Sequence, residues 1–148
     1  MKFIGCNGFF LNIIPPTATA QQKGERVVGG RIHHYIKKNV LDAEAILRDA
    51  LLPNLFDEPI TDKPIHLRVF WYFPYPKSAK KHKPGMLRYK TTRPDTDNLN
   101  KLLKDVMTDM GFWKDDALIA KEEITKCYND VPGIWISVST LETDVEFI

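Results

Sequence analysis

The sequence predicts a single compact α+β domain in which a mixed β-sheet is combined with two main helices. Its 148 residues suffice for one hydrophobic core and not comfortably for two. The composition, 43% hydrophobic and 27% charged, is that of an ordinary soluble globular protein. Strand-like and helix-like patterns alternate along the chain without repeats. We therefore expect one domain over residues 1–148, with an irregular basic loop at about 74–94 and an acidic tail at about 142–148.

The first half of the chain predicts a strand, a hairpin and a helix. The apolar run at residues 8–14 ends at two prolines and favours a strand. Residues 25–35 fit a hairpin, because Gly29 and Gly30 supply the positive φ angles that its two-residue turn needs. Asn39 is suited to cap a helix that ends near Pro53. Its buried stripe is expected to consist of Val40, Ala43, Leu47, Ala50 and Leu51, which recur at helical spacing.

The second half predicts one dominant strand, a long loop, a clear helix and two more strands. Residues 65–73 (IHLRVFWYF) are dense in aromatic and β-branched side chains, which favours a strand. Residues 98–110 carry an apolar stripe at helical spacing, and Gly111 is suited to a left-handed C-cap. The last two strands are expected at 118–128 and 134–141, joined by a hairpin-like turn through 130–133.

Four aspartates flank the second helix. Asp95 and Asp97 stand just ahead of it, and Asp115 and Asp116 follow its end. Pro94 favours an extended lead-in, where residues two apart share a face, so the first two carboxylates are expected to point at one ion. Clustered carboxylates suit hard divalent cations such as Mg²⁺, which can activate water for phosphodiester hydrolysis. The pattern therefore predicts a metal-dependent nuclease with all four aspartates as metal ligands.

The two aspartate pairs can form one site only if they meet. A helix of about 13 residues spans about 20 Å, so the second pair begins at the far end from the first. The second pair can arrive if its loop folds back, if the following strand runs alongside, or if a second subunit supplies it. The sequence does not choose among these three arrangements.

Lys101 lies one helical turn beyond Asp97, on the polar side of the helix. There its ammonium can face the scissile phosphate and neutralise charge in the transition state. The alternative is structural: Asp97 caps the helix or pairs with Lys101 at i,i+4, and Asp115 and Asp116 form a solvated turn. An EF-hand is excluded, because Leu99 and Asn100 stand where that loop needs an acid or amide and a glycine.

The loop ahead of Asp95 is strongly basic. Residues 75–93 contain seven lysines and arginines and no acid. A cationic loop beside a carboxylate cluster would bring a polyanion to the metal, although a solvated charge run is the simpler alternative. The candidate DNA-binding residues are Lys77, Lys80, Lys81, Lys83, Arg88, Lys90 and Arg93.

Other cofactor sites and a membrane location are not expected. Cys6 and Cys127 form no CxxC pair, and reduced thiols in a cytoplasm are the default. His33 and His34 would point to opposite faces of a strand, so a zinc site is not predicted. No apolar run approaches the roughly 20 residues of a transmembrane helix. We expect no small-molecule cofactor and no membrane partner.

The motif Asp95-x-Asp97-Asn-Leu-x-Lys101, a helix, and then Gly-Phe-Trp-x-Asp115-Asp116 resembles the RusA family of phage-type Holliday-junction resolvases. Residues 15–24 and 130–134 also resemble phage and prophage members. The resemblance implies a RusA-like fold and a homodimer that nicks four-way DNA junctions symmetrically with Mg²⁺, for which Mn²⁺ is expected to substitute. It also implies that Asp95, Asp97 and Asp116 are the essential aspartates, that Asp115 is the adjacent acid and that Lys101 is the catalytic lysine. The expected location is the cytoplasm of a bacterial host, with a phage or prophage gene.

Two alternatives use the same residues differently. A less selective metal-dependent nuclease would cut flaps or other branched DNA with the same carboxylates. A non-catalytic DNA-binding accessory protein would carry the aspartates as surface charge only. Cleavage of four-way junctions, compared with linear duplex, separates the three functions.

Overall fold

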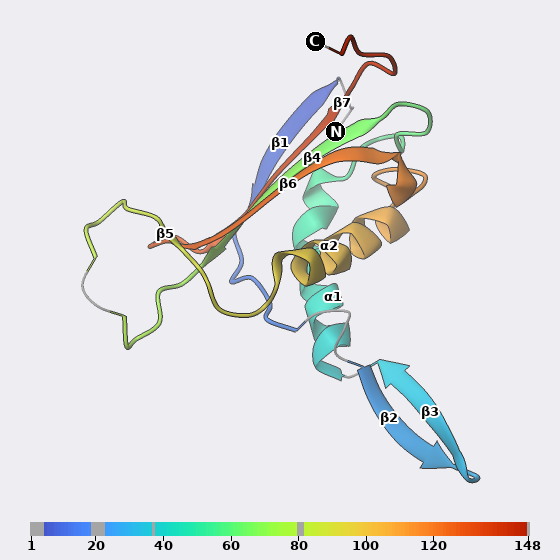
Figure 1. Cartoon of the computed structure of the whole chain (residues 1–148), viewed down its shortest axis with the longest axis vertical. Coiled ribbons are helices and arrows are strands. Elements are labelled where there is room, and N and C mark those ends of the chain that lie inside the picture. Colours follow the sequence, from blue (N-terminus) through green and yellow to red (C-terminus); the bar gives the residue numbers. More distant parts are fainter. Residues whose placement is uncertain (1–4, 19–22, 37, 80–81, 148) are drawn as a thin grey trace.

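The computed structural model describes residues 5–18, 23–36, 38–79 and 82–147 and shows an α+β fold (Figure 1). Five strands form a mixed sheet in the order β1-β7-β4-β6-β5, and β2 and β3 form a separate hairpin. The strands are β1 (Cys6–Leu11), β2 (Lys23–Val28), β3 (Arg31–Ile36), β4 (Ile65–Phe73), β5 (Arg88–Tyr89), β6 (Ile119–Tyr128) and β7 (Gly133–Thr140). The helices are α1 (Lys38–Leu51) and α2 (Thr96–Met110), with short 3-10 turns η1 (Leu52–Asn54) and η2 (Asp116–Leu118).

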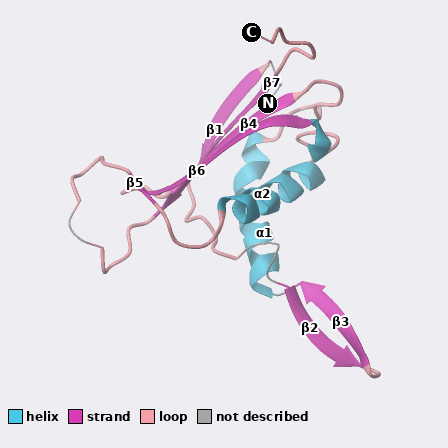
Figure 2. Cartoon of the chain, in the orientation of Figure 1, coloured by secondary structure: helices cyan, strands magenta, loops and turns pink. Residues whose placement is uncertain are grey.

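Strand β4 is the centre of the sheet and of the core. Its alternate residues Ile65, Leu67, Val69, Trp71 and Phe73 are buried, as the period of two along a strand requires. Strand β6 runs parallel to β4, and α2 lies in the connection between them, so the three elements form a β-α-β unit. Both helices cover the same side of the sheet (Figure 2). The core therefore lies between one face of the sheet and the two helices.

The apolar stripe of α2 fixes that helix on the sheet. Its buried apolar residues are Leu99, Leu102, Leu103, Val106 and Met107. Each fully buried side chain of this size contributes about 1.5–3 kcal/mol. The helix ends as predicted at Gly111, whose φ of 92° is left-handed. Just beyond it, Trp113 is buried and its indole N–H donates to Thr108 Oγ1 at 2.7 Å, which anchors the end of the helix.

Several sequence predictions are confirmed and others are wrong. Residues 65–73 form a strand, and the predicted hairpin turns at Gly29 and Gly30, whose φ angles are 57° and 80°. The last two strands exist, but they do not pair with each other, because β4 lies between β6 and β7. The predicted hairpin-like turn is thus a connection across the central strand. Asn39 is also not a cap, since α1 already includes Lys38.

The β2–β3 hairpin stands apart from the body of the protein. Among the described strands, β2 and β3 pair only with each other, and the hairpin projects beyond the first turn of α1 (Figure 1). In the part of the chain that the structure describes, no helix is both long and apolar enough to cross a membrane.

Candidate active site

Asp95 and Asp97 lie at the N-terminus of α2, in a different geometry from the one predicted. Asp95 is the N-cap residue, with extended backbone (φ −71°, ψ 149°), and the helix begins at Thr96. The backbone N–H of Leu99 donates to the Asp95 carbonyl at 3.1 Å, which is the first helical hydrogen bond. Asp97 is therefore in the first helical turn, so the prediction that both aspartates share one face of an extended segment is wrong. Both aspartates lie at the positive end of the helix dipole, which favours negative charge there.

Both carboxylates are exposed and make no structural contact of their own. Asp95 occupies the N-cap position, but its side chain accepts no capping hydrogen bond. Among the described residues, the side chains of Asp95 and Asp97 have no hydrogen-bond or ion-pair partner. The alternative in which Asp97 caps the helix is therefore contradicted. Two exposed, unpaired carboxylates at one helix terminus remain available to a cation.

Lys101 does not pair with Asp97 either. Its ammonium lies 3.5 Å from Asp105 Oδ2, one turn further along α2, and its side chain is 54% exposed. An exposed i,i+4 pair of this kind is worth about 0.3–0.5 kcal/mol, so it holds the lysine only weakly. The ammonium can therefore leave Asp105 and contact another anion at the surface of α2.

The segment that leads into Asp95 is held by Lys126 near the end of β6. The Lys126 ammonium donates to the carbonyl oxygens of Thr92 at 2.6 Å and Pro94 at 2.8 Å. Pro94 is buried and immediately precedes Asp95. The position of the first aspartate thus depends on a lysine 31 residues later in the chain.

A second lysine reinforces the same segment. The Lys90 ammonium donates to Thr92 Oγ1 at 2.6 Å and to the Tyr128 hydroxyl at 3.3 Å, and it lies 5.2 Å from the centre of the Phe73 ring. The hydrogen bond with Thr92, together with the Lys90 ammonium, lowers the pKa of the Tyr128 phenol below its usual range. These contacts engage Lys90 within the fold, although the sequence suggested a DNA contact for it.

Asp115 and Asp116 lie beyond the opposite end of α2. Asp115 caps the η2 turn, and its Oδ1 accepts from the backbone N–H of Ala117 at 2.9 Å. Asp116 is the first residue of that turn and is exposed. The local role of Asp115 agrees with the alternative of a solvated turn, whereas the Asp116 carboxylate has no such role among the described contacts.

The path of β6 shows that the two aspartate pairs are far apart in one protomer. Lys126 reaches the lead-in before α2, whereas Glu122 contacts the amide of Asn100 at 2.9 Å and the ammonium of Lys104 at 3.1 Å. Strand β6 therefore runs antiparallel to α2, and its start lies at the C-terminal end of the helix. The 15 residues of α2 span about 22 Å.

The cluster of four carboxylates is accordingly not assembled within one chain. Among the residues with described positions, no three or more His, Cys, Asp or Glu side chains are grouped to hold a metal ion. Asp115 and Asp116 stay at the end of α2 that is remote from Asp95, and β6 returns toward Asp95 without them. The structure of one protomer therefore shows neither of the two arrangements within a single chain, and the contribution of a second subunit stays a prediction.

The basic loop is anchored at its middle. The Tyr75 ring stacks on His82 with 3.6 Å between centroids, and His82 Nε2 lies 2.6 Å from Asp130 Oδ1. The hydrogen bond with His82, and a second one from the backbone N–H of Gly85, lower the pKa of the Asp130 carboxyl. Asp130 thus attaches the loop to the connection between β6 and β7.

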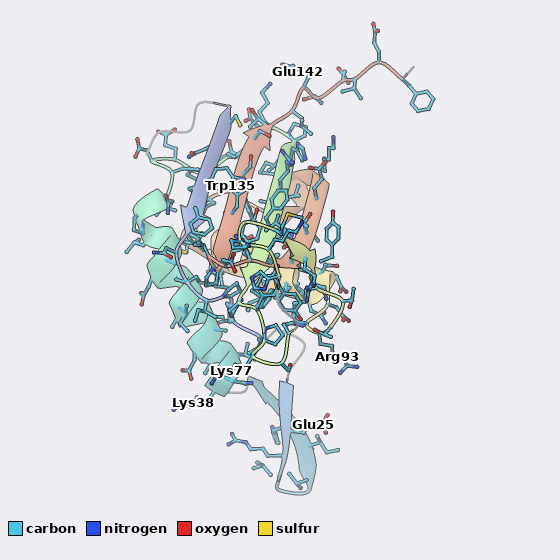
Figure 3. The ribbon with its side chains drawn as sticks, turned by 90° about the vertical axis from the view of Figure 1, so that its left-hand side faces the viewer. Glu25, Lys38, Lys77, Arg93, Trp135 and Glu142 are labelled. Atoms are coloured by element: carbon cyan, nitrogen blue, oxygen red, sulfur yellow. The ribbon has the colours of Figure 1, made fainter. Side chains whose placement is uncertain are left out.

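Four further cations of the loop, in its described part, face solvent. Lys77, Lys83, Arg88 and Arg93 are exposed, and the Arg88 guanidinium lies 5.6 Å from the centre of the Tyr75 ring. Figure 3 shows Lys77 and Arg93 at the same end of the molecule. Lys80 and Lys81, two further predicted DNA contacts, lie outside the described residues.

Sequence reasoning missed the polar network beneath α2. Asn100 is fully buried, and its Oδ1 accepts from the Trp71 indole N–H at 2.8 Å. The sequence contained a signal for this network, because Asn100 stands at helical spacing from Leu103 and Met107, within the apolar stripe. A polar residue at such a core position requires a hydrogen-bond partner. Lys126 gave no such signal, since its role depends on which strand lies beside residues 92–94.

The chain belongs to the RusA family of endodeoxyribonucleases. The model of that family, described as Endodeoxyribonuclease RusA, matches residues 14–139. This confirms the resemblance inferred from the aspartate motif.

Two relatives show how far the similarity extends. The protein named crossover junction endodeoxyribonuclease rusA of Lactococcus phage r1t is 31% identical over 123 residues, which cover 82% of this chain and 88% of the phage protein. The uncharacterized protein YqaN of Bacillus subtilis (strain 168) is 32% identical over 88 residues, or 55% of this chain and 61% of YqaN.

Proposed function

We propose that this protein resolves four-way (Holliday) DNA junctions by hydrolysing phosphodiester bonds in two opposed strands. Family membership and the name of the phage relative support this activity. The observation that carries the proposal is the pair of exposed, unpartnered carboxylates, Asp95 and Asp97, placed at a helix N-terminus directly after a basic loop. That arrangement offers ligands to a cation and phosphate contacts to DNA at one place.

The proposed cofactor is Mg²⁺, with Mn²⁺ as a substitute. Asp95, Asp97, Asp115 and Asp116 carry the hard oxygen donors that these ions prefer, and all four residues are exposed. When bound, the ion supplies an activated water and stabilises the leaving oxygen. The task of the chain is to hold these carboxylates in place, and Lys126 does so by fixing the backbone ahead of Asp95.

Lys101 is the proposed stabiliser of transition-state charge. It lies on the exposed side of α2, one turn beyond Asp97, and its weak pair with Asp105 leaves the ammonium free to turn to a phosphate. A positioned cation is most effective where negative charge increases during the reaction. The DNA itself is proposed to lie against Lys77, Lys80, Lys81, Lys83, Arg88 and Arg93, with Lys90 keeping the segment before Asp95 in place.

The functional unit is proposed to be a homodimer with composite sites. If two α2 helices lie antiparallel about a two-fold axis, Asp95 and Asp97 of one protomer approach the partner's Asp115 and Asp116. A two-fold dimer then contains two identical sites, which suits two coordinated cuts in opposed strands. The working location is proposed to be the cytoplasm of a bacterial host, in line with a phage relative and a Bacillus relative.

Mixed dimers test the composite site. Asp97→Asn and Asp116→Asn homodimers should both be inactive on a synthetic junction. In a mixed dimer of the two variants, composite sites leave one site with both changes and one site intact, so nicking of a single strand should return. If each site lay within one chain, both sites of the mixed dimer would carry a lesion and no nicking would return.

The activity itself is tested with the wild-type protein. A synthetic mobile junction is incubated with and without Mg²⁺, beside linear duplex and flap DNA of the same sequence. We expect paired, symmetric nicks in the junction that require the cation. Equal cutting of linear duplex would indicate a less selective nuclease, and inactivity with both Mg²⁺ and Mn²⁺ would indicate an accessory DNA-binding protein.

A further inference from the structure

The β2–β3 hairpin pairs with no other strand of the described structure. It forms its own two-stranded sheet and extends away from the helices (Figures 1 and 3). A two-stranded hairpin by itself is at best marginally stable in water. We therefore expect this projecting hairpin to be stabilised by a molecule that it binds.

The two faces of the hairpin differ in charge. Directly paired residues of antiparallel strands share a face, so Arg26 and His33 lie on the same face as Val28 and Arg31. These four residues are exposed, and the two arginines belong to neighbouring pairs of that face. The opposite face carries the apolar pair Val27 and Ile32 and also Glu25. One face is thus cationic, and none of its described side chains is a carboxylate.

The hairpin and the basic loop project from the body of the protein in different directions. Figure 1 shows the loop beside β5 on one side and the hairpin beyond the first turn of α1, and Figure 3 shows Glu142, in the acidic tail, at the opposite end of the molecule from Glu25. A branched polyanion could therefore contact the loop with one arm and the hairpin with another. A two-stranded ribbon also has the size that the major groove of B-DNA, about 12 Å wide, admits.

We propose that the β2–β3 hairpin is a DNA-binding arm, in which Arg26 and Arg31 contact the phosphate backbone of one arm of the junction. This proposal rests on the proposed function for the identity of the DNA, and it adds a contact surface outside the aspartate motif and the basic loop. The charge of this face favours nucleic acid, since contact with the same face of a second copy would bring like charges together.

The test compares two double variants of equal charge change. Arg26→Gln/Arg31→Gln removes the cations of the arm, and the control Lys63→Gln/Lys121→Gln removes two exposed cations near the starts of β4 and β6. Junction binding is measured without divalent cation from 50 to 200 mM salt. Each lost phosphate contact should reduce the slope of log affinity against log salt by ~0.9. A dimer of the arm variant lacks four arginines, so with both hairpins bound its slope should fall by ~3.6, and that of the control should not change.

Further readouts separate the possible outcomes. When the arm variant is present at a concentration that saturates the junction, its single-turnover cleavage rate should equal the wild-type rate, because the aspartates are intact. A slope equal to the wild-type slope would overturn the proposal. A loss of the dimer in sedimentation would also overturn it, since the hairpin would then be a contact between copies. A wild-type protein that binds junctions without cutting them would refute the proposed function, while the slope comparison would still decide the role of the arm.

Discussion

Lys126 offers the sharpest test of how the fold positions the site. Lys126→Met keeps the apolar stem and removes the ammonium that holds the carbonyls of Thr92 and Pro94 at 2.6 and 2.8 Å. A hydrogen bond from a charged donor contributes about 1.5–3 kcal/mol, and the partial exposure of this lysine favours the lower figure. A loss of about 1.4 kcal/mol lowers the ratio of ordered to disordered lead-in about tenfold, and the apparent cation affinity of Asp95 falls by up to the same factor.

The measurement is single-turnover junction cleavage as a function of Mg²⁺ concentration. We expect Lys126→Met to need up to about tenfold more Mg²⁺ for its half-maximal rate and to approach the wild-type rate at saturation. Lys126→Arg should restore most of the affinity, because a guanidinium also donates to carbonyl oxygens. The control Lys121→Met changes an exposed lysine of the same strand. An unchanged Mg²⁺ requirement in Lys126→Met would show that the lysine does not position Asp95.

Three further changes separate chemistry from stability. Asp97→Asn should retain or tighten junction binding, because it removes negative charge near the phosphates. It should abolish cleavage, because the metal ion loses a hard ligand, and cleavage at near the wild-type rate would exclude Asp97 from the site. Lys101→Ala should slow single-turnover cleavage ~100-fold or more and change the unfolding free energy by no more than ~0.5 kcal/mol, as its side chain is exposed and paired only with Asp105. A clear loss of unfolding free energy with almost no loss of cleavage rate would contradict its catalytic role. Asn100→Ala should reduce the unfolding free energy in urea by about 1–3 kcal/mol, because the buried Trp71 N–H loses its acceptor. A loss below ~0.5 kcal/mol would contradict this expectation.

The elements with strong local patterns were predictable from the sequence. Strand β4 has nine residues that alternate between buried and more accessible positions, and α2 repeats apolar residues at helical spacing up to a glycine cap. The order of the strands was not predictable in the same way. Strands β6 and β7 are neighbours in sequence, but the apolar β4 separates them, and no local feature of the connecting residues records that. Strand pairing is decided by the whole core.

The aspartates and lysines around Asp95 predict a cation and a phosphate at the site, and this stays a prediction, whereas the geometry predicted for them was wrong. Their conformation depends on where the helix begins, and the bond from Leu99 to the Asp95 carbonyl places that point two residues earlier than Asn98. The support from Lys126 depends on the register of β5 and β6, which brings residue 126 beside residue 94.

The separation of the two aspartate pairs has a physical reason in the proposed composite site. Four carboxylates within a few ångströms repel strongly without a cation. In one protomer the pairs are held apart by the length of α2, with Asp97 near the positive end of the helix dipole and Asp115 capping η2. Each chain can thus fold without the repulsion of a complete site. In the proposed dimer that repulsion arises only where the partner is present, and there the bound cation offsets it, so that hydrolysis depends on the same symmetric assembly that presents two sites to two strands.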